Sequence, residues 1–241
     1  MIEVDLPGGR AVFTTREGGV SEGAYESLNL GILTDDEPPR VIENRRRTAA
    51  AAGLEPERIA MAWQVHGAEL REWAGPPEEP TYGLPGATLD RVDGHLTSVA
   101  GLGLLVLAAD CLPVALARNE GPPALAVLHA GWKGLLAGIV AGGAAALGGG
   151  RLAAIVGPAI GPCCYEVGPE VAGPFAEAFG ADVVSGRSLD LPLAAERALR
   201  ATGVETVEQT GLCTSCHPDL FFSHRRDGGQ TGRQGVLAHV A

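Results

Sequence analysis

The 241-residue sequence lacks an apolar run long enough to span a membrane. Its most apolar segment, residues 101–117, falls short of the roughly 20 residues that a spanning helix needs. Asp110, Cys111 and Pro113 also interrupt this segment. The N-terminus has neither the basic start nor the apolar stretch of a secretory signal peptide. We therefore expect a cytoplasmic protein without a membrane partner.

Basic side chains are scarce. The chain has 18 Lys and Arg against 29 Asp and Glu, a formal net charge of −11. Such a charge opposes protein-wide attraction to nucleic acid. Because 46% of the residues are hydrophobic and 20% are charged, the composition is that of an ordinary globular protein with a sizeable core. We expect one domain over residues 1–241 that binds a small molecule, and no nucleic acid.

Two nucleotide motifs are also missing. The sequence GWKG at 131–134 lacks the GxxxxGK[ST] spacing that wraps a nucleoside triphosphate. The zinc nucleobase deaminases need HxE followed by PCxxC. Here Gly131 takes the place of the Glu, and Leu212 precedes Cys213. The sequence thus excludes a P-loop ATPase and that deaminase fold.

The hydrophobic pattern predicts alternating strands and helices. Three apolar runs between Leu102 and Leu128 follow one another without a helix, which does not suit a regular βαβ series. We therefore expect an α+β fold with layered sheets and helices. The segment 74–85, rich in Gly, Pro and Glu, is expected to form an exposed loop beside the site. Expected strands are 10–15, 59–65, 102–108, 113–117, 124–128, 151–156 and 205–209; expected helices are 39–52, 135–147, 170–179 and 193–201.

Three reactive side chains stand at the ends of apolar runs: His66, Cys111 and His129. Taken alone, His66 is more often a hydrogen-bonded structural histidine and Cys111 an inert thiol, whereas a functional role is favoured for His129, which closes an apolar run just before Gly131. Together they form a Cys/His/His set, which suits a zinc ion with three protein ligands and a fourth position open to water or substrate. An open position indicates catalysis. Gly131, close behind His129, would allow a ligand to approach the backbone.

The other four cysteines form two pairs in the sequence. Cys163 and Cys164 are adjacent, and Cys213 and Cys216 form a CxxC followed by His217. The CxxC could be a redox pair or half of a zinc site. There is no second CxxC, and adjacent residues point to opposite faces of a strand, so Cys163 and Cys164 are not expected to share one metal. Structural roles are predicted for all four.

Basic groups gather in the segment 223–227 and at Arg233. Guanidinium groups suit phosphate or carboxylate, but an internal salt-bridge network would use the same residues. Arg16, Asn29 and Arg45 raise the same question, because residues 14–16 and 29–31 stand at predicted strand-to-loop transitions. We expect Asn29 and Arg45 to contact the substrate.

Seven sequence blocks follow one another along nearly the whole chain: TTREGGVS at 14–21, SLNLG at 27–31, QVHG at 64–67, ADCLP at 109–113, HAGWKG at 129–134, GPAIGPCCYEVG at 157–168 and FFSHRRDGGQTGRQ at 221–234. This series resembles the multicopper polyphenol oxidase, or laccase-domain, family, whose members are also described as purine nucleoside phosphorylases. The resemblance implies a layered α/β/β/α fold similar to the catalytic domain of cysteine-hydrolase toxins. It also implies a metal held by His66, Cys111 and His129.

The resemblance implies several activities. Family members look like zinc enzymes, with copper possible, that phosphorolyse adenosine, inosine, guanosine and methylthioadenosine and deaminate adenosine. A nucleoside and phosphate are then the expected partners. One branch looks like a peptidoglycan editing factor that acts on a muramyl intermediate carrying the wrong amino acid.

The residue composition of the chain excludes one activity that the family name suggests and bears on the choice of metal. A multicopper oxidase needs more imidazoles than the six present, so we reject that activity. A blue-copper site would need an axial Met, and Met61 lies five residues before His66, so copper binding is possible but zinc is expected. Asp110 is the candidate acid/base for deamination.

Two alternatives remain open. In a cysteine hydrolase, Cys111 would be the nucleophile and His129 or His66 its base, which would suit peptidoglycan editing. In a zinc-stabilised binding protein, His217 or Cys216 would complete a closed four-ligand site, and chelation would unfold the chain.

Overall fold

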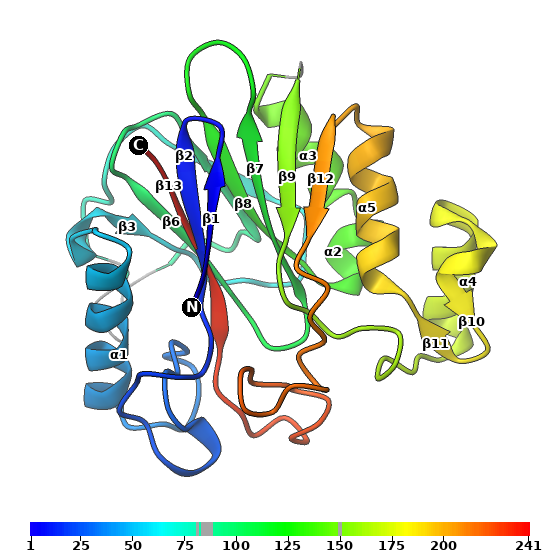
Figure 1. Ribbon diagram of the computed structural model, residues 1–241, viewed down its shortest axis with the longest axis horizontal. Helices are drawn as coiled ribbons and strands as arrows, with labels where there is room; N and C mark the ends of the chain where they lie inside the picture. Colours follow the sequence, from blue (N-terminus) through cyan, green and yellow to red (C-terminus); the bar gives the residue numbers. More distant parts are fainter. Residues whose placement is uncertain (81, 83–88, 149–150) are drawn as a thin grey trace.

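The computed structural model describes the whole chain except residues 81, 83–88 and 149–150. Two β-sheets pack face to face, and helices cover their outer faces (Figure 1). The layer order is therefore α/β/β/α. This confirms the predicted mixed, layered fold; the likeness to cysteine-hydrolase toxins stays an expectation.

The first sheet has five strands in the order β1-β2-β13-β6-β3. All neighbours are antiparallel except β3 and β6, which are parallel. Helix α1 (Pro38–Ala51) packs on its outer face, where Val12 and Leu237 contact the helix-side cluster that includes Ala49. The strands are β1 (Ile2–Leu6), β2 (Gly9–Phe13), β3 (Ile59–Ala60), β6 (Gly103–Ala108) and β13 (Gln234–Val240).

The second sheet has six strands in the order β12-β9-β7-β8-β5-β4. The outer pairs β12–β9 and β4–β5 are parallel and the inner pairs are antiparallel. The strands are β4 (Leu70–Trp73), β5 (Gly94–Thr97), β7 (Leu112–Arg118), β8 (Leu125–Ala130), β9 (Leu152–Val156) and β12 (Thr206–Gln209).

Helices α2 (Trp132–Leu136), α3 (Ile139–Ala146) and α5 (Leu191–Ala201) pack on the outer face of this second sheet. Helix α4 (Pro169–Phe179) and the small hairpin of β10 (Val184–Ser185) and β11 (Ser188–Leu189) lie beyond α5, at the edge of the molecule (Figure 1). Short 3-10 turns occur at Gly23–Tyr25, Pro56–Arg58 and Ala181–Val183. Among the described helices none is long and apolar enough to cross a membrane.

The central layer of the core lies between the two sheets. Strand β8 shows the period of two that this arrangement requires. Leu125 and Val127 face the other sheet, whereas Ala126 and Leu128 face the helices. Because both faces of β8 are covered, all six of its residues are buried. This rigid strand carries His129 near its C-terminal end.

Most predicted elements are confirmed, with shifts of one or two residues at their ends. The predicted helix 135–147 is in fact two helices, because Gly138 adopts a left-handed conformation (φ 88°) between α2 and α3. The predicted strand 59–65 is paired only at Ile59–Ala60. Strands β1, β4, β5, β10, β11 and β13 were not expected. The loop 74–85 is described only in part, and residues 74–80 contain neither helix nor strand.

Candidate metal centre

The structure brings His66, Cys111 and His129 together at one edge of the sheets. One ring nitrogen of each histidine and the Cys111 Sγ lie within 4.8 Å of one another. The imidazole rings meet edge to face, with centroids 4.9 Å apart. Sheet register explains part of this: Pro113 in β7 pairs with His129 in β8, which leaves Cys111 beside that histidine. No further His, Cys, Asp or Glu of the described residues joins this group.

Two residues of this edge have a positive φ. His66 (φ 60°) and Asp110 (φ 88°) are the only described residues other than glycine in that region of backbone space. Such conformations cost roughly 1–3 kcal/mol each and persist where the surroundings determine them. One belongs to a candidate ligand and the other directly precedes Cys111. The surrounding hydrogen bonds therefore have to hold both loops in place.

The buried carboxylate of Asp93 holds the His66 loop. It accepts the backbone N–H of His66 at Oδ1 (2.9 Å) and that of Gly67 at Oδ2 (2.7 Å). Oδ1 also lies 2.8 Å from Nδ1 of His129. One carboxylate thus fixes a loop backbone and a ring orientation at the same time. A metal-binding histidine commonly donates its second ring N–H to such a carboxylate.

Sequence reasoning missed Asp93. It directly precedes β5, a strand that the pattern did not predict, and it ends no apolar run. The available signal was a lone acidic residue directly before the short buried strand Gly94–Thr97. Only the sheet pairing between β5 and β8 reveals its place opposite His129.

Asp110 holds the Cys111 loop in a similar way. Its Oδ1 accepts the hydroxyl of Thr214 (2.6 Å) and its Oδ2 accepts the backbone N–H of Arg225 (2.7 Å). It is 8% exposed. These bonds position the turn that presents the thiol, and they tie the segments around 214 and 225 to it. Its predicted acid/base role in deamination is not tested by these contacts.

Gly131 is needed at this point because the site is crowded. A Cβ there would lie 3.0 Å from the Cys111 Sγ and 3.1 Å from Cδ2 of His66. The missing side chain therefore allows the thiol and the imidazole to approach each other across this backbone.

Burial by itself raises the pKa of the Cys111 thiol and lowers the pKa of the His129 imidazole. The two groups lie so close together that their opposite charges outweigh this effect of burial. The charge of His129 and hydrogen bonds from both histidines lower the pKa of Cys111 to about 6. The thiolate and Asp93 raise the pKa of His129 to about 9. Hydrogen bonds from His129 and from backbone N–H groups likewise hold the pKa of Asp93 below its usual value against its burial. Without a metal, the site favours a thiolate–imidazolium pair.

A pocket of about 530 Å³ opens above these three residues. This volume lies within the range of small-molecule sites. Apolar side chains form much of its wall, and the exposed Leu33 and Trp63 stand among them. Tyr165, Arg225 and Arg233 also line it.

Asn29 and Arg45 lie behind the pocket wall. Both are fully buried, at 0% and 1% exposure. Asn29 Oδ1 accepts the backbone N–H of Gly31 (2.9 Å) and of Arg233 (2.8 Å), and Arg45 donates to the Leu30 carbonyl. These bonds hold the 31–34 segment, which does line the pocket. The structure thus gives both residues a supporting position, and their direct contact with substrate stays a prediction.

The arginines of the segment 223–227 and Arg233 divide between the two roles that the sequence left open, an internal salt-bridge network and a contact with an anion. Arg226 pairs with Asp227 and donates to the carbonyls of Thr214 and Phe221, which makes it part of an internal network. Arg225 and Arg233 face the pocket instead.

Arg16 also belongs to a structural network. It donates to the carbonyls of Glu26 and Pro218 and lies over the ring of Phe222, 4.7 Å from its centroid.

The donor set suits a metal ion of borderline softness. Two imidazoles and a thiolate are ligands that zinc prefers, and three protein ligands are typical of catalytic zinc. The same set also suits copper. His217 and Cys216, the proposed fourth ligands of a closed site, lie elsewhere: Nδ1 of His217 is 2.9 Å from the Cys213 carbonyl, and Cys216 groups with the other cysteines.

These features define a protein of two packed sheets with a Cys/His/His cluster at one edge that could hold a metal ion. The family model described as multi-copper polyphenol oxidoreductase laccase matches residues 10–241, so the chain belongs to this family.

Two relatives are similar in sequence to this chain over nearly its whole length. The chain is 38% identical to the purine nucleoside phosphorylase PA4543 of Pseudomonas aeruginosa over 238 residues, which cover 95% of this chain and 92% of the relative. It is 36% identical to the purine nucleoside phosphorylase YfiH of Escherichia coli over 231 residues, 92% of this chain and 90% of the relative.

Solved structures agree with this. The crystal structure of YlmD from Geobacillus stearothermophilus matches with a TM-score of 0.86 at 32% identity, and it covers 98% of this chain and 93% of that chain. The hypothetical protein YfiH of Bacillus licheniformis matches with a TM-score of 0.86 at 30% identity, over 97% and 93% of the two chains.

Proposed function

We propose that the protein is a metal-dependent purine nucleoside phosphorylase that uses zinc at His66, Cys111 and His129. The observation that carries this is the three-ligand centre at the base of a pocket that is both apolar and lined by arginines. Several relatives bear the name of this activity. Adenosine, inosine, guanosine and methylthioadenosine are the proposed nucleosides.

The apolar wall suits the purine. Leu33 and Trp63 are exposed at 65% and 47% although large apolar side chains usually gain free energy from burial. A flat purine that covers them would remove this surface from water. Trp132 and Tyr165 add further aromatic groups to the same pocket.

The arginines suit the phosphate. Arg225 lies over the Tyr165 ring, 5.2 Å from its centroid, and one of its nitrogens donates to the Glu166 carbonyl. Nη1 of Arg233 donates to the carbonyls of Thr231 and Gly232. A guanidinium has five N–H donors, so both side chains retain donors for an anion while their stems are held.

Bond cleavage at C1′ needs the attacking phosphate to be positioned and the charge on the departing purine to be stabilised. A zinc ion at this centre would supply Lewis-acid stabilisation, and the same site would serve adenosine deamination. Asp93 orients His129 through Nδ1 and fixes the His66 loop, so the chain itself sets the ligand geometry.

The test incubates the purified protein with adenosine, with and without phosphate, and identifies the products by mass spectrometry. We expect adenine and ribose 1-phosphate only when phosphate is present, with inosine as evidence of deamination. Cys111→Ala should remove all of these products, and retained turnover in that variant would contradict the proposal.

One observation favours a second candidate, a cysteine hydrolase. Cys111, His129 and Asp93 form a chain in which the imidazole lies between a thiol and a buried carboxylate. This is the arrangement that activates a thiol nucleophile. A muramyl intermediate carrying the wrong amino acid would be the substrate in the peptidoglycan editing branch.

Metal analysis separates the two candidates. A protein with no metal at His66, Cys111 and His129 that hydrolyses such a muramyl substrate, and that loses this activity when Cys111 is alkylated, would support the hydrolase. Zinc lost on Cys111→Ala, together with phosphate-dependent nucleoside cleavage, would exclude it.

A further inference from the structure

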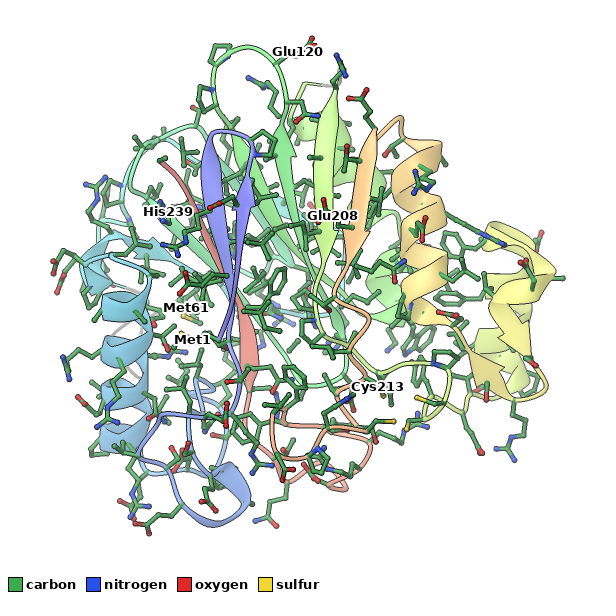
Figure 2. The ribbon with its side chains drawn as sticks, viewed as in Figure 1. Met1, Met61, Glu120, Glu208, Cys213 and His239 are labelled. Atoms are coloured by element: carbon green, nitrogen blue, oxygen red, sulfur yellow. The ribbon has the colours of Figure 1, made fainter. Side chains whose placement is uncertain are left out.

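Four cysteines outside the pocket converge on one point. Cys163, Cys164, Cys213 and Cys216 place their sulfur atoms within 4.8 Å of one another. The Cys216 Sγ lies 3.4 Å from that of Cys163 and 3.4 Å from that of Cys164. Figure 2 labels Cys213 in the lower right of the view, below strand β12, with further sulfur atoms beside it. We refer to these residues as the four-cysteine cluster.

We did not expect Cys163 and Cys164 to share one metal, yet the structure brings both sulfur atoms to the same point. That expectation assumed a strand, but Cys163 and Cys164 lie in a turn. The backbone N–H of Cys164 donates to the Gly161 carbonyl (3.0 Å) and closes this turn. Turn geometry directs both side chains toward Cys213 and Cys216. The opposite-face rule holds only for extended backbone.

The sulfur spacing suits a tetrahedral metal better than disulfides. With Zn–S bonds of about 2.3 Å, tetrahedral geometry separates the sulfurs by about 3.8 Å. The observed distances, from 3.4 Å to at most 4.8 Å, lie around this value. All five cysteines of the chain are free thiols in the structure. Cys216 is equally distant from two partners, so the geometry selects no disulfide pair.

The loop backbone also favours thiolate sulfur. The N–H of Gly161 donates to the Cys213 Sγ at 3.3 Å. An N–H donor stabilises the negative sulfur that a metal requires. Cys213 is 8% exposed, whereas Cys163 and Cys216 are exposed. An ion at this point would therefore enter from the surface.

We propose that the four-cysteine cluster is a second metal site, which binds one zinc ion through four thiolates. Four soft thiolates in a tetrahedral arrangement are typical of structural zinc, since they leave no position open for substrate. Zn²⁺ displaces the thiol protons to solvent, and neither the metal nor the sulfur changes oxidation state.

This ion would hold together two loops that support the pocket. One loop is the turn at 161–164, and the other is the CxxC segment at 213–216. Thr214, within that segment, donates to Asp110, which directly precedes Cys111. The N–H of Thr214 also donates to the Ala159 carbonyl (3.0 Å), so the two loops already lie side by side. The second zinc thus stabilises the support of the first site without contacting substrate.

The test measures zinc per chain in the protein purified from zinc-supplemented growth. We expect about two zinc ions in the wild type and about one in Cys111→Ala, where the remaining ion is held by the four-cysteine cluster. The double variant Cys163→Ser/Cys216→Ser should lose the other ion. Ser215→Ala, between the two ligands of the CxxC, is the matched control and should retain both.

Cobalt distinguishes the sites even if the double variant fails to fold. Co²⁺ added to metal-free Cys111→Ala should give the strong thiolate-to-cobalt charge-transfer absorption of a four-sulfur site. Absence of this absorption, zinc-free Cys111→Ala, iron at the cluster, or disulfides found by mass spectrometry of the native chain would each overturn the proposal. None of these outcomes depends on turnover of nucleosides, so the proposed function can fail separately.

Discussion

The cluster of His66, Cys111 and His129, which we call the pocket cluster, differs from the four-cysteine cluster in how the fold holds it. His66, Cys111 and His129 come from three separate parts of the chain, and the buried carboxylate of Asp93 orients two of them. The four-cysteine cluster comes from only two loops, and a backbone N–H is the partner of one of its sulfurs. A mixed three-ligand set leaves room for chemistry, whereas four thiolates close a site. The comparison therefore separates a candidate catalytic centre from a candidate structural one.

The largest expected effect is a difference in lost activity between variants of the two clusters. Cys111→Ala should lower nucleoside phosphorolysis by about 10³-fold or more, since it removes a ligand of the group that stabilises developing charge. Cys216→Ser should cause a much smaller loss, because Cys216 does not line the pocket and acts on it through the supporting loops, for example through Thr214 and Asp110. Initial rates at saturating phosphate measure both. Equal losses in the two variants would remove the distinction between the clusters.

Asp93→Asn tests the support of the pocket cluster alone. The change keeps the shape of the side chain but removes the charge that His129 faces. We expect zinc affinity and activity to fall by roughly 10- to 100-fold, as for other partners of metal-binding histidines. Zinc competition with a chromophoric chelator measures the affinity, and cobalt absorption of the four-cysteine cluster should stay unchanged. An unaltered affinity would show that Asp93 does not orient the ligand.

Gly131→Ala tests how tightly the pocket cluster is packed. The added methyl would press on the Cys111 Sγ and on His66, each within 3.1 Å. We expect activity to fall by about tenfold, because small misplacements of reacting groups are costly. Gly142→Ala in α3 is the matched control, since its Cβ would meet only a Leu70 methyl at 3.4 Å. That variant should keep full activity, and a loss there comparable with that of Gly131→Ala would contradict the packing argument.

Local signals were enough to predict most of the fold. The apolar runs in β6, β7 and β8 were visible because both faces of these strands are buried and their sequences are almost continuously apolar. Strand β1 alternates half-buried and exposed residues over only a few positions, and β4 has a single buried residue, Trp73, so neither pattern is long enough to stand out. Their pairing partners, distant in sequence, determine them.

The candidate site was predictable only where a reactive side chain follows an apolar run. His66, Cys111 and His129 carry that signal, and the structure brings them together. Asp93 carries none, and its place depends on β5 pairing with β8. The four-cysteine cluster was missed because the prediction assumed extended backbone at Cys163 and Cys164, although Gly161-Pro162 directly before them is a turn signal and the backbone does turn there.

Two buried histidines, His129 and His95, differ in the direction in which the fold shifts their pKa. His129 has a thiolate and a carboxylate as partners, which raise its pKa to about 9. His95 in β5 is fully buried, and burial together with the nearby charge of Arg71 lowers its pKa to about 4. Its Nδ1 accepts the Trp73 indole N–H (3.1 Å), so Nε2 carries the proton, and this buried nitrogen has no protein partner among the described residues.

His95 should make the fold sensitive to acid. Between its unfolded value of 6.5 and about pH 4, the unfolded chain binds a proton at this position and the folded chain does not. Stability is therefore kept above pH 6.5 and falls as the pH drops, by on the order of 2 kcal/mol at pH 5. Urea unfolding of the wild type and His95→Gln from pH 7 to pH 5 measures this. The variant should lose part of the slope, whereas His239→Gln, at a half-buried histidine of β13, should keep it. Parallel curves for wild type and His95→Gln would mean that His95 is not held neutral in the fold.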